Sequence, residues 1–187
     1  LTVTGIGSVG SGVVTVASGA TFEIDKAGPA TLANTVTGGG GLTKRGAADL
    51  QIDGTNTYSG PTNILAGSVT TFSFGNNAIG DQSDVTIAAN AALALITAET
   101  IGSLSGGGRA GGTGADPRTL TTGGSGNNAD FAGVLANNAF GPGGATLTVN
   151  KIGAGTQTLS GISTYTGPTA VSGGRLVVNG SIASSSG

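Results

Sequence analysis

Residues 44–69 read KRGAADLQIDGTNTYSGPTNILAGSV, and residues 151–176 read KIGAGTQTLSGISTYTGPTAVSGGRL. The second stretch follows the first at a constant offset of 107 positions (151 minus 44), without a gap. The shared positions are Lys44/Lys151, Gly46/Gly153, Ala47/Ala154, Gly54/Gly161, Thr57/Thr164, Tyr58/Tyr165, Gly60/Gly167, Pro61/Pro168, Thr62/Thr169 and Gly67/Gly174. An internal repeat among short alternating segments predicts a solenoid, because each repeat has an apolar face that only its neighbour can cover. The repeat therefore favours a rod or an extended surface over a pocket.

Short runs of alternating apolar and polar residues predict β-strands throughout the chain. The stretch 85–95 matches the stretch 14–24 at a second offset of 71 positions. We expect both stretches to form strand–turn–strand units, although 88–100 is the best helix signal in the sequence. The side chains predicted to face inward are those of Leu50, Ile52, Val85, Ile87, Leu93, Leu95, Leu147, Val149, Leu159, Val171 and Leu176.

Glycine clusters at 38–41 and 106–114 predict corners or a loop, because glycine adopts left-handed backbone conformations at little cost. The stretch 109–118, RAGGTGADPR, has the least periodicity and contains two of the four arginines. We expect this stretch to be the longest excursion from the solenoid.

The composition argues against several classes of function. The 187 residues include 38 glycines but no His and no Cys, and 9% of them are charged. The chain therefore lacks an imidazole base, a thiolate nucleophile and the two commonest zinc ligands. With a net charge of −2 and seven scattered Lys and Arg residues, it has no basic stripe for a nucleic-acid backbone. We expect no catalytic residues, no cofactor, no metal and no nucleic-acid partner.

The organisation of the chain is that of one continuous domain. No linker long enough to separate domains occurs, so residues 1–187 are predicted to form a single β-solenoid. No apolar run approaches the roughly 20 residues that a transmembrane helix requires. The chain begins at Leu1 without the features of a secretory leader, and we expect an internal segment or a processed product.

The cassettes resemble the autotransporter-associated β-strand repeat of bacterial passenger domains. That pattern reads L-x-K-x-G-x-G-x-L-x-L-x-G-x-N-T-Y-x-G-x-T and continues into a G-x-L strand. The first copy matches it at Leu42, Lys44, Gly46, Leu50, Ile52, Gly54, Asn56, Thr57, Tyr58, Gly60, Thr62 and Gly67, and the second at Lys151, Gly153, Gly155, Leu159, Gly161, Thr164, Tyr165, Gly167, Thr169, Gly174 and Leu176. The departures are Ala48 for the second glycine and Gln157 for the first strand leucine, with Pro61 and Pro168 where a glycine is common.

The resemblance implies an all-β fold, a right-handed parallel β-helix that is secreted or displayed on a bacterial surface, and it implies no catalytic residues. Elementary packing agrees with this form. Stacked coils place like residues above like, so small apolar side chains fill a thin interior and backbone hydrogen bonds run along the axis. At roughly 20 to 25 residues per coil, the chain should form about eight coils.

Two glycine motifs have both a ligand-binding and a turn interpretation. Residues 5–10 match G-x-G-x-x-G, but a strand follows instead of the helix that a dinucleotide site needs, so a turn is favoured. Residues 123–131 resemble one calcium-binding nonapeptide. A calcium site of that kind needs successive copies with aspartates, whereas this single copy has Asn128 at the aspartate position. We therefore expect turns at both places.

The acidic residues and the tyrosines are the other candidates for a site. Three acidic pairs, Glu23 with Asp25, Asp49 with Asp53 and Asp81 with Asp84, could serve a polysaccharide-degrading β-helix. We interpret them as outward, solubilising positions. Tyr58 and Tyr165 could be carbohydrate-stacking platforms, but their equivalent places in the repeat favour a structural role, with the ring on the next coil and the hydroxyl in water.

These observations predict a non-enzymatic, extracellular solenoid that serves as a stiff shaft or fibre. An adhesin that binds a glycan or a host protein through 109–118 is the first alternative, and a polysaccharide-degrading enzyme is the second. Scattered acids would favour the shaft, and acids clustered in one groove would favour the enzyme. Read head to tail, 176–187 continue into 1–16 without breaking the alternation, so we expect copies to stack end to end, covalently or by self-association.

Overall fold

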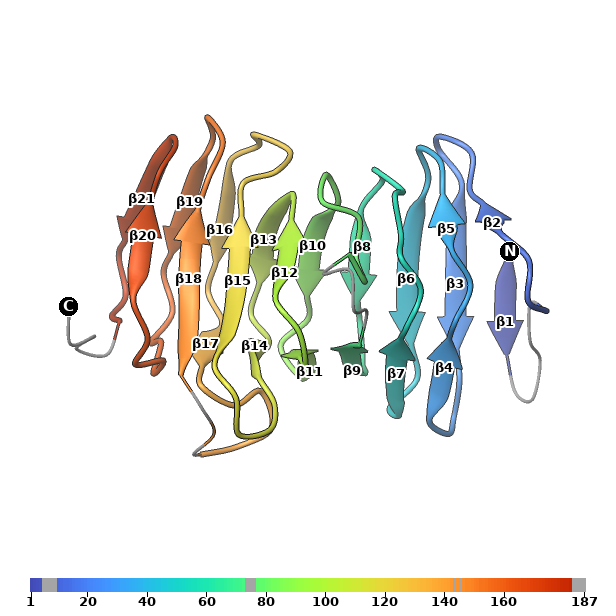
Figure 1. Cartoon of the computed structure of the whole chain (residues 1–187), viewed down its shortest axis with the longest axis horizontal. Helices are drawn as coiled ribbons and strands as arrows, with labels where there is room; N and C mark the ends of the chain where they lie inside the picture. The colour runs from blue at the N-terminus through green and yellow to red at the C-terminus, as the bar shows by residue number, and fades with distance from the viewer. Residues whose placement is uncertain (5–9, 73–76, 143, 145, 183–187) are drawn as a thin grey trace.

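The computed structural model describes residues 1–4, 10–72, 77–142, 144 and 146–182. In these residues the chain forms strands, turns and bends but no helix. It follows that the described part of the chain contains no helix able to cross a membrane. Figure 1 shows the strands side by side along the long axis, with the N-terminus at one end and the C-terminus at the other. The predicted all-β fold is confirmed.

The described residues form four sheets. The longest has nine strands in the order β1 (Thr2–Thr4), β3 (Thr21–Asp25), β6 (Gly41–Arg45), β8 (Thr62–Ile64), β10 (Asp84–Ile87), β13 (Ser103–Gly106), β16 (Ala129–Phe131), β19 (Thr156–Leu159) and β21 (Arg175–Val178). The second has six strands, β17 (Val134–Ala136), β14 (Arg109–Gly112), β11 (Ala91–Leu95), β9 (Gly67–Thr71), β7 (Asp49–Ile52) and β4 (Ala30–Leu32). The remaining two contain β12 (Glu99–Ile101), β15 (Arg118–Thr122), β18 (Leu147–Lys151) and β20 (Thr169–Val171), and β2 (Val14–Thr15) with β5 (Val36–Thr37).

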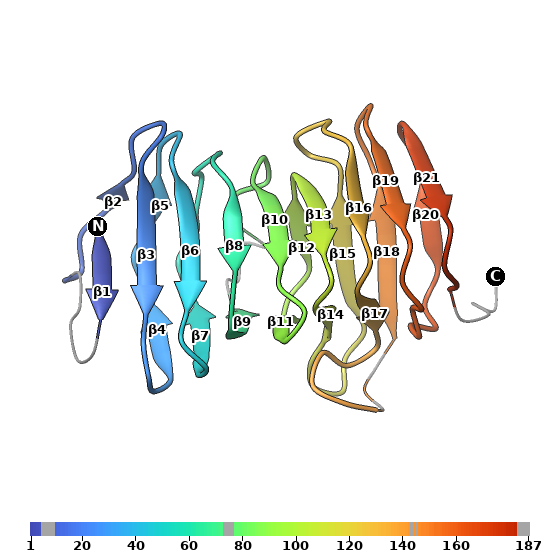
Figure 2. The ribbon, with the colours of Figure 1, turned by 180° about the vertical axis from the view of Figure 1, so that it is seen from behind.

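Neighbouring strands are parallel, and each pair joins one coil to the next. In the nine-stranded sheet, Thr21 pairs with Gly41, 20 positions later. The chain therefore winds through about eight coils, as predicted, and the strands of successive coils lie beside one another in Figures 1 and 2. This arrangement is a parallel β-helix, or β-solenoid, in which backbone hydrogen bonds follow the long axis.

The core is a stack of inward-facing side chains. Apolar and polar residues alternate along each strand, so the apolar side chains lie on the inner side. One row runs through paired residues of the six-stranded sheet, namely Ala30, Leu50, Val69, Leu93, Ala110 and Leu135. Of the eleven residues predicted to face inward, Leu50, Ile52, Val85, Ile87, Leu93, Leu95, Leu147, Val149 and Leu159 are buried. The alternation of residue types therefore predicted most of the core.

Two residues predicted to face inward are not fully buried, although Leu176 packs against the core. Val171 is 52% exposed, and Leu176 is only half-buried. Both belong to β20 and β21, the last strands of their sheets in the described part of the chain. An inward side chain of a solenoid is covered by the coils on both sides, and here the described structure has a coil on one side only.

The turn predictions are confirmed in part. Both strand–turn–strand units form, since β2 leads through a turn into β3, and β10 leads through a turn into β11. The first glycine cluster, 38–41, makes a corner: Gly38 has a φ of 103°, and a Cβ there would lie 2.2 Å from the carbonyl oxygen of Val16. The motif at 5–10 lies almost entirely outside the described residues.

The prediction for the second glycine cluster is partly wrong, because residues 109–112 form strand β14. Glycine is required there by close approach of backbone, since a Cβ at Gly111 would lie 2.3 Å from the carbonyl oxygen of Ala136. In the nine-stranded sheet, the largest sequence separation between paired residues occurs in the following coil, where Ala129 pairs with Gln157, 28 positions later. That coil contains the connection between β17 and β18, whose residues 137–142 lie at the lower edge of the solenoid in Figure 1.

Candidate functional site

The two cassette tyrosines lie inside the solenoid. Tyr58 is 1% exposed and Tyr165 is 0% exposed, so neither ring is available to stack on a sugar. The Tyr58 hydroxyl lies 2.6 Å from Oγ1 of Thr62, which is 2.8 Å from Oγ of Ser83 in the next coil. The structural role is confirmed, but the expectation that the hydroxyl is in water is wrong. Burial raises the pKa of Tyr58, so the phenol stays neutral and can donate this hydrogen bond.

The two cassette lysines are also buried, each 1% exposed, which the sequence analysis did not anticipate. Each ammonium group donates to carbonyls of its own corner and of the following coil. The acceptors of Lys44 Nζ are Arg45 O at 2.6 Å, Gly46 O at 2.7 Å and Ala66 O at 3.2 Å, and those of Lys151 Nζ are Ile152 O, Gly153 O at 3.1 Å and Gly173 O at 3.3 Å. The cassette lysine therefore joins one coil to the next. The presence of lysine at the same position of both cassettes was the sequence signal from which this role could have been predicted. Burial lowers the pKa of both ammonium groups.

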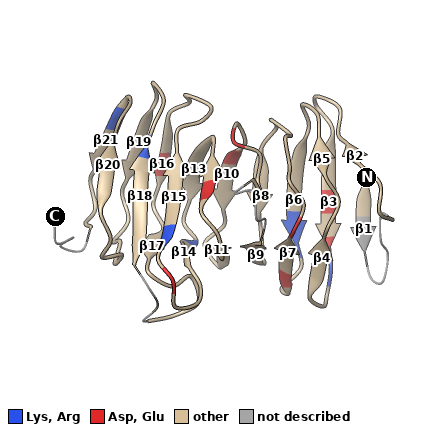
Figure 3. Cartoon of the chain, viewed as in Figure 1, with Lys and Arg blue, Asp and Glu red and all other residues tan. Residues whose placement is uncertain are grey.

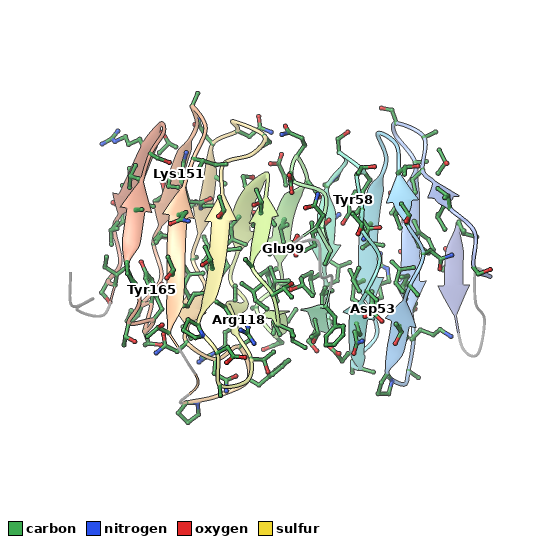
Figure 4. All side chains as sticks on the ribbon, viewed as in Figure 1. Asp53, Tyr58, Glu99, Arg118, Lys151 and Tyr165 are labelled. Atoms are coloured by element: carbon green, nitrogen blue, oxygen red, sulfur yellow. The ribbon has the colours of Figure 1, made fainter. Side chains whose placement is uncertain are left out.

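Glu99, on β12, is a further buried ionisable residue that sequence reasoning missed. It is 1% exposed, and its carboxylate accepts hydrogen bonds from the backbone N–H of Ala78 at 3.2 Å and of Ile79 at 3.0 Å. Burial raises its pKa to about 8, with a contribution from Asp81, against the lowering effect of these two hydrogen bonds. Figure 4 places Glu99 in the middle of the rod. Its contacts anchor backbone of the preceding coil, which is a structural task.

Gln157, which departs from the repeat pattern, spans the interior. Its Nε2 donates to the carbonyl of Leu104 at 2.8 Å, and its Oε1 accepts from the Leu104 N–H at 3.1 Å and from the Thr122 hydroxyl at 3.2 Å. A polar side chain is tolerated at this buried position because each of its polar atoms has a partner.

The acidic residues are spread along the rod and take part in separate contacts (Figure 3). Glu23 forms an ion pair with Arg45 at 2.7 Å, and Asp49 accepts hydrogen bonds from Ser68 and Thr70 of the next coil. Figure 3 shows the acidic residues distributed over several strands. Over the described ranges, no group of three or more Asp and Glu residues is arranged to hold a metal ion.

The calcium-like stretch 123–131 forms a turn and then strand β16. Its polar side chains bind other parts of the protein: Asn127 donates to Asp84 at 2.7 Å, and Asn128 accepts from the Thr156 N–H at 2.7 Å. Asp84 also accepts from Ser103 and Ser125, and these hydrogen bonds lower its pKa below the ordinary value. The turn interpretation is confirmed, and the side-chain oxygens of Asn128 and Asp84 accept hydrogen bonds from other parts of the chain.

The arginines of 109–118 lie beside the connection 137–146. Arg109, on β14, donates from Nε to the carbonyl of Asn138 at 3.0 Å and from Nη2 to that of Gly141 at 3.2 Å. Arg118 begins β15, and its Nη2 is 3.5 Å from a carboxylate oxygen of Asp116. Arg109 therefore fastens this connection to the outer face of the six-stranded sheet.

Comparison with known proteins gives a consistent assignment. The model of the passenger-associated-transport-repeat matches twice, at residues 42–70 and 149–178. The chain is also similar to the adhesin BmaC autotransporter of Brucella suis biovar 1 (strain 1330), with 38% identity over 164 residues. These cover 85% of the chain but 4% of that adhesin, so the chain spans a small part of its relative's length. No solved structure matches the chain. The chain is therefore a β-solenoid with two passenger-associated transport repeats, and this repeat family together with the adhesin relative indicates that it is secreted or displayed on the bacterial cell surface.

Proposed function

We propose that the chain acts as a stiff shaft segment of a surface protein. The observation that carries the proposal is the continuous nine-stranded parallel sheet, in which every strand between β1 and β21 is hydrogen-bonded on both sides. In such a rod the free energy of folding is distributed over contacts between neighbouring coils, so length can be added by copying coils. A shaft of this kind resists proteolysis, because its backbone is paired along most of its length.

The proposal includes stacking of copies or of further coils at the two ends. Leu1 and Val13 at one end are 71% and 66% exposed, and Val171 and Val178 at the other are 52% and 40% exposed. Strands β1 and β21 each have one neighbour in the described structure, and an unpaired strand edge is a template for another strand. The N–H groups of Arg175 and Asn179 bind the previous coil, so the intervening N–H of Val178 points toward the free edge.

Electron microscopy of the isolated chain, together with sedimentation, tests the stacking. We expect filaments or elongated oligomers whose amount rises with protein concentration. Val178→Pro should reduce them, because it removes a donor at the free edge, whereas Val178→Ala should leave them largely intact. A protein that stays monomeric at every concentration would overturn self-association.

We further propose that the shaft has no catalytic activity, which the distribution of acidic residues supports. Reducing-end assays with common polysaccharides provide the test. Saturable turnover that a single Asp→Asn or Glu→Gln substitution abolishes would overturn the proposal.

A further inference from the structure

The two cassettes lie on different faces of the solenoid. Lys44 belongs to β6 of the nine-stranded sheet, whereas Lys151 belongs to β18 of the four-stranded sheet. Along the row of paired residues that begins at Lys44, the fifth partner is Leu159 on β19, 115 positions later (159 minus 44). The repeat offset of 107 is eight positions shorter (115 minus 107), so the second cassette begins one strand earlier in its coil.

Each cassette is longer than one coil, and its last part pairs with its own first part. The pairs that join the two parts are Lys44–Ile64 and Leu50–Val69 in the first cassette, and Lys151–Val171 and Gln157–Leu176 in the second. Each cassette therefore contains one complete coil that closes on itself.

The identical lysines and tyrosines make their side-chain hydrogen bonds inside this closed coil. Within the described residues, each lysine Nζ donates to the carbonyls one, two and 22 positions later. Each tyrosine hydroxyl lies 2.6 Å from the threonine Oγ1 four positions later. The Tyr165–Thr169 pair forms in the last described coil, so it does not need the further contact that Thr62 makes to Ser83. The same internal contacts thus form on two different faces.

Other side-chain hydrogen bonds leave the cassette, and positions that differ between the copies make them. Asn56 accepts from the N–H of Val36 in the preceding coil at 2.6 Å, and Gln157 donates to the carbonyl of Leu104 at 2.8 Å. The equivalent positions of the other cassette hold a serine and a leucine. The side chains that bind neighbouring coils are therefore adapted to their place in the rod, whereas the shared lysine and tyrosine are not.

We infer that the cassette is a self-contained closed coil, whose lysine and tyrosine hold its two ends together whichever sheet carries them. Its glycines fit the same interpretation, because the atoms they approach are backbone: a Cβ at Gly46 would lie 2.1 Å from the carbonyl oxygen of Lys26, and one at Gly153 would lie 2.1 Å from that of Gly123. Any neighbouring sequence supplies such carbonyls. The cassette can therefore recur at an offset that is not a whole number of coils. The inference is independent of the shaft proposal, since it concerns closure within one coil.

Hydrogen exchange of the whole chain, followed by mass spectrometry, tests the inference. Lys44→Met should raise the exchange rate of amides in 44–69 by about tenfold or more and leave 151–176 unchanged, because the buried carbonyls that lose their donor belong to the first cassette. Lys151→Met should have the opposite pattern with an effect of similar size. Arg45→Met and Ile152→Met, at the next position of each cassette, are the matched controls and should change neither rate.

Gln157→Leu gives the contrasting result. It restores the leucine of the first cassette but removes the hydrogen bonds to Leu104 and Thr122. The exchange rate should therefore rise around these two residues, which lie outside 151–176.

The inference is overturned if Lys44→Met raises exchange equally in both cassettes, or if Lys151→Met leaves its own cassette protected. It is also overturned if the effect of Gln157→Leu is confined to 151–176. Should a lysine variant fail to fold, Tyr58→Phe and Tyr165→Phe provide the same comparison, because each removes one hydroxyl from its own closed coil. Each tyrosine variant should then raise exchange in its own cassette only, and a rise in both would overturn the inference.

Discussion

The hydroxyl oxygen of Tyr58 lies 2.6 Å from Oγ1 of Thr62 inside the solenoid, and Tyr165 stands at the same distance from Thr169 in the second cassette. The T-Y-x-G-P-T motif thus encodes a corner in which the aromatic ring fills the interior and its one polar atom is paired four residues later. Pairing of this kind lets a large side chain with a hydroxyl be buried without leaving a donor unsatisfied.

Tyr58→Phe should lower the free energy of unfolding by about 1–2 kcal/mol, because the Thr62 hydroxyl loses a buried partner. Urea denaturation followed by circular dichroism measures the change. Tyr165→Phe should cost less, since Thr169 is only half-buried in the last described coil. Equal stability of Tyr58→Phe and the wild type would contradict this account of the corner.

Lys44→Met should lower the free energy of unfolding by about 1–3 kcal/mol. The substitution keeps the length of the side chain but leaves the carbonyls of Arg45, Gly46 and Ala66 without their buried donor. Arg45→Met is the matched control, because its side chain is in solvent, and it should have a much smaller effect. If the two variants lose the same stability, Lys44 does not fasten the coils.

Glu99 should make the stability depend on pH. Its pKa is raised from 4.5 to about 8 in the folded protein, so the folded state holds a proton that the unfolded state releases between these values. The stabilisation is fully present below about pH 4.5 and is lost as the pH rises through 8, with a total loss of up to about 5 kcal/mol.

Glu99→Gln, which cannot ionise, should lack this dependence, so its stability relative to the wild type should rise between pH 5 and pH 9. Asp116→Asn, at an exposed carboxylate, is the control and should keep the wild-type profile. A constant difference between Glu99→Gln and the wild type across this range would show that Glu99 does not titrate there.

Leu159→Asp should cost about 3–5 kcal/mol, because Leu159 is 2% exposed and the substitution buries a charge without a partner. Ile162→Asp, three residues later and 70% exposed, should be nearly neutral. Thermal denaturation of the two variants measures the contrast. The same experiment at Ile87, which is 0% exposed, should repeat it in the middle of the rod.

The period-2 alternation predicted the strands and most of the core because it depends on neighbouring residues alone. The same local reasoning could not predict how far Val171 and Leu176 are exposed, because burial also depends on the presence of a following coil. It also failed at Gly111, which lies in a strand and not in a turn. Glycine is needed there because the backbone of residues 25 to 28 positions later in the chain leaves no room for a Cβ. These errors share one cause, which is contact between coils.

The amino-acid sequence by itself therefore determined the solenoid. Two cassettes that align without a gap, short runs of alternating apolar and polar residues, and glycine corners together predict a stack of parallel coils. The tertiary structure alone decided what the individual polar groups do. Whether Lys44, Glu99 and Tyr58 point into the interior depends on which carbonyls and N–H groups the adjoining coil brings within about 3 Å. Residue types and spacing do not specify those distances, because the coils vary in length, from 19 to 28 positions in the nine-stranded sheet, and the length of a coil sets which residues become partners.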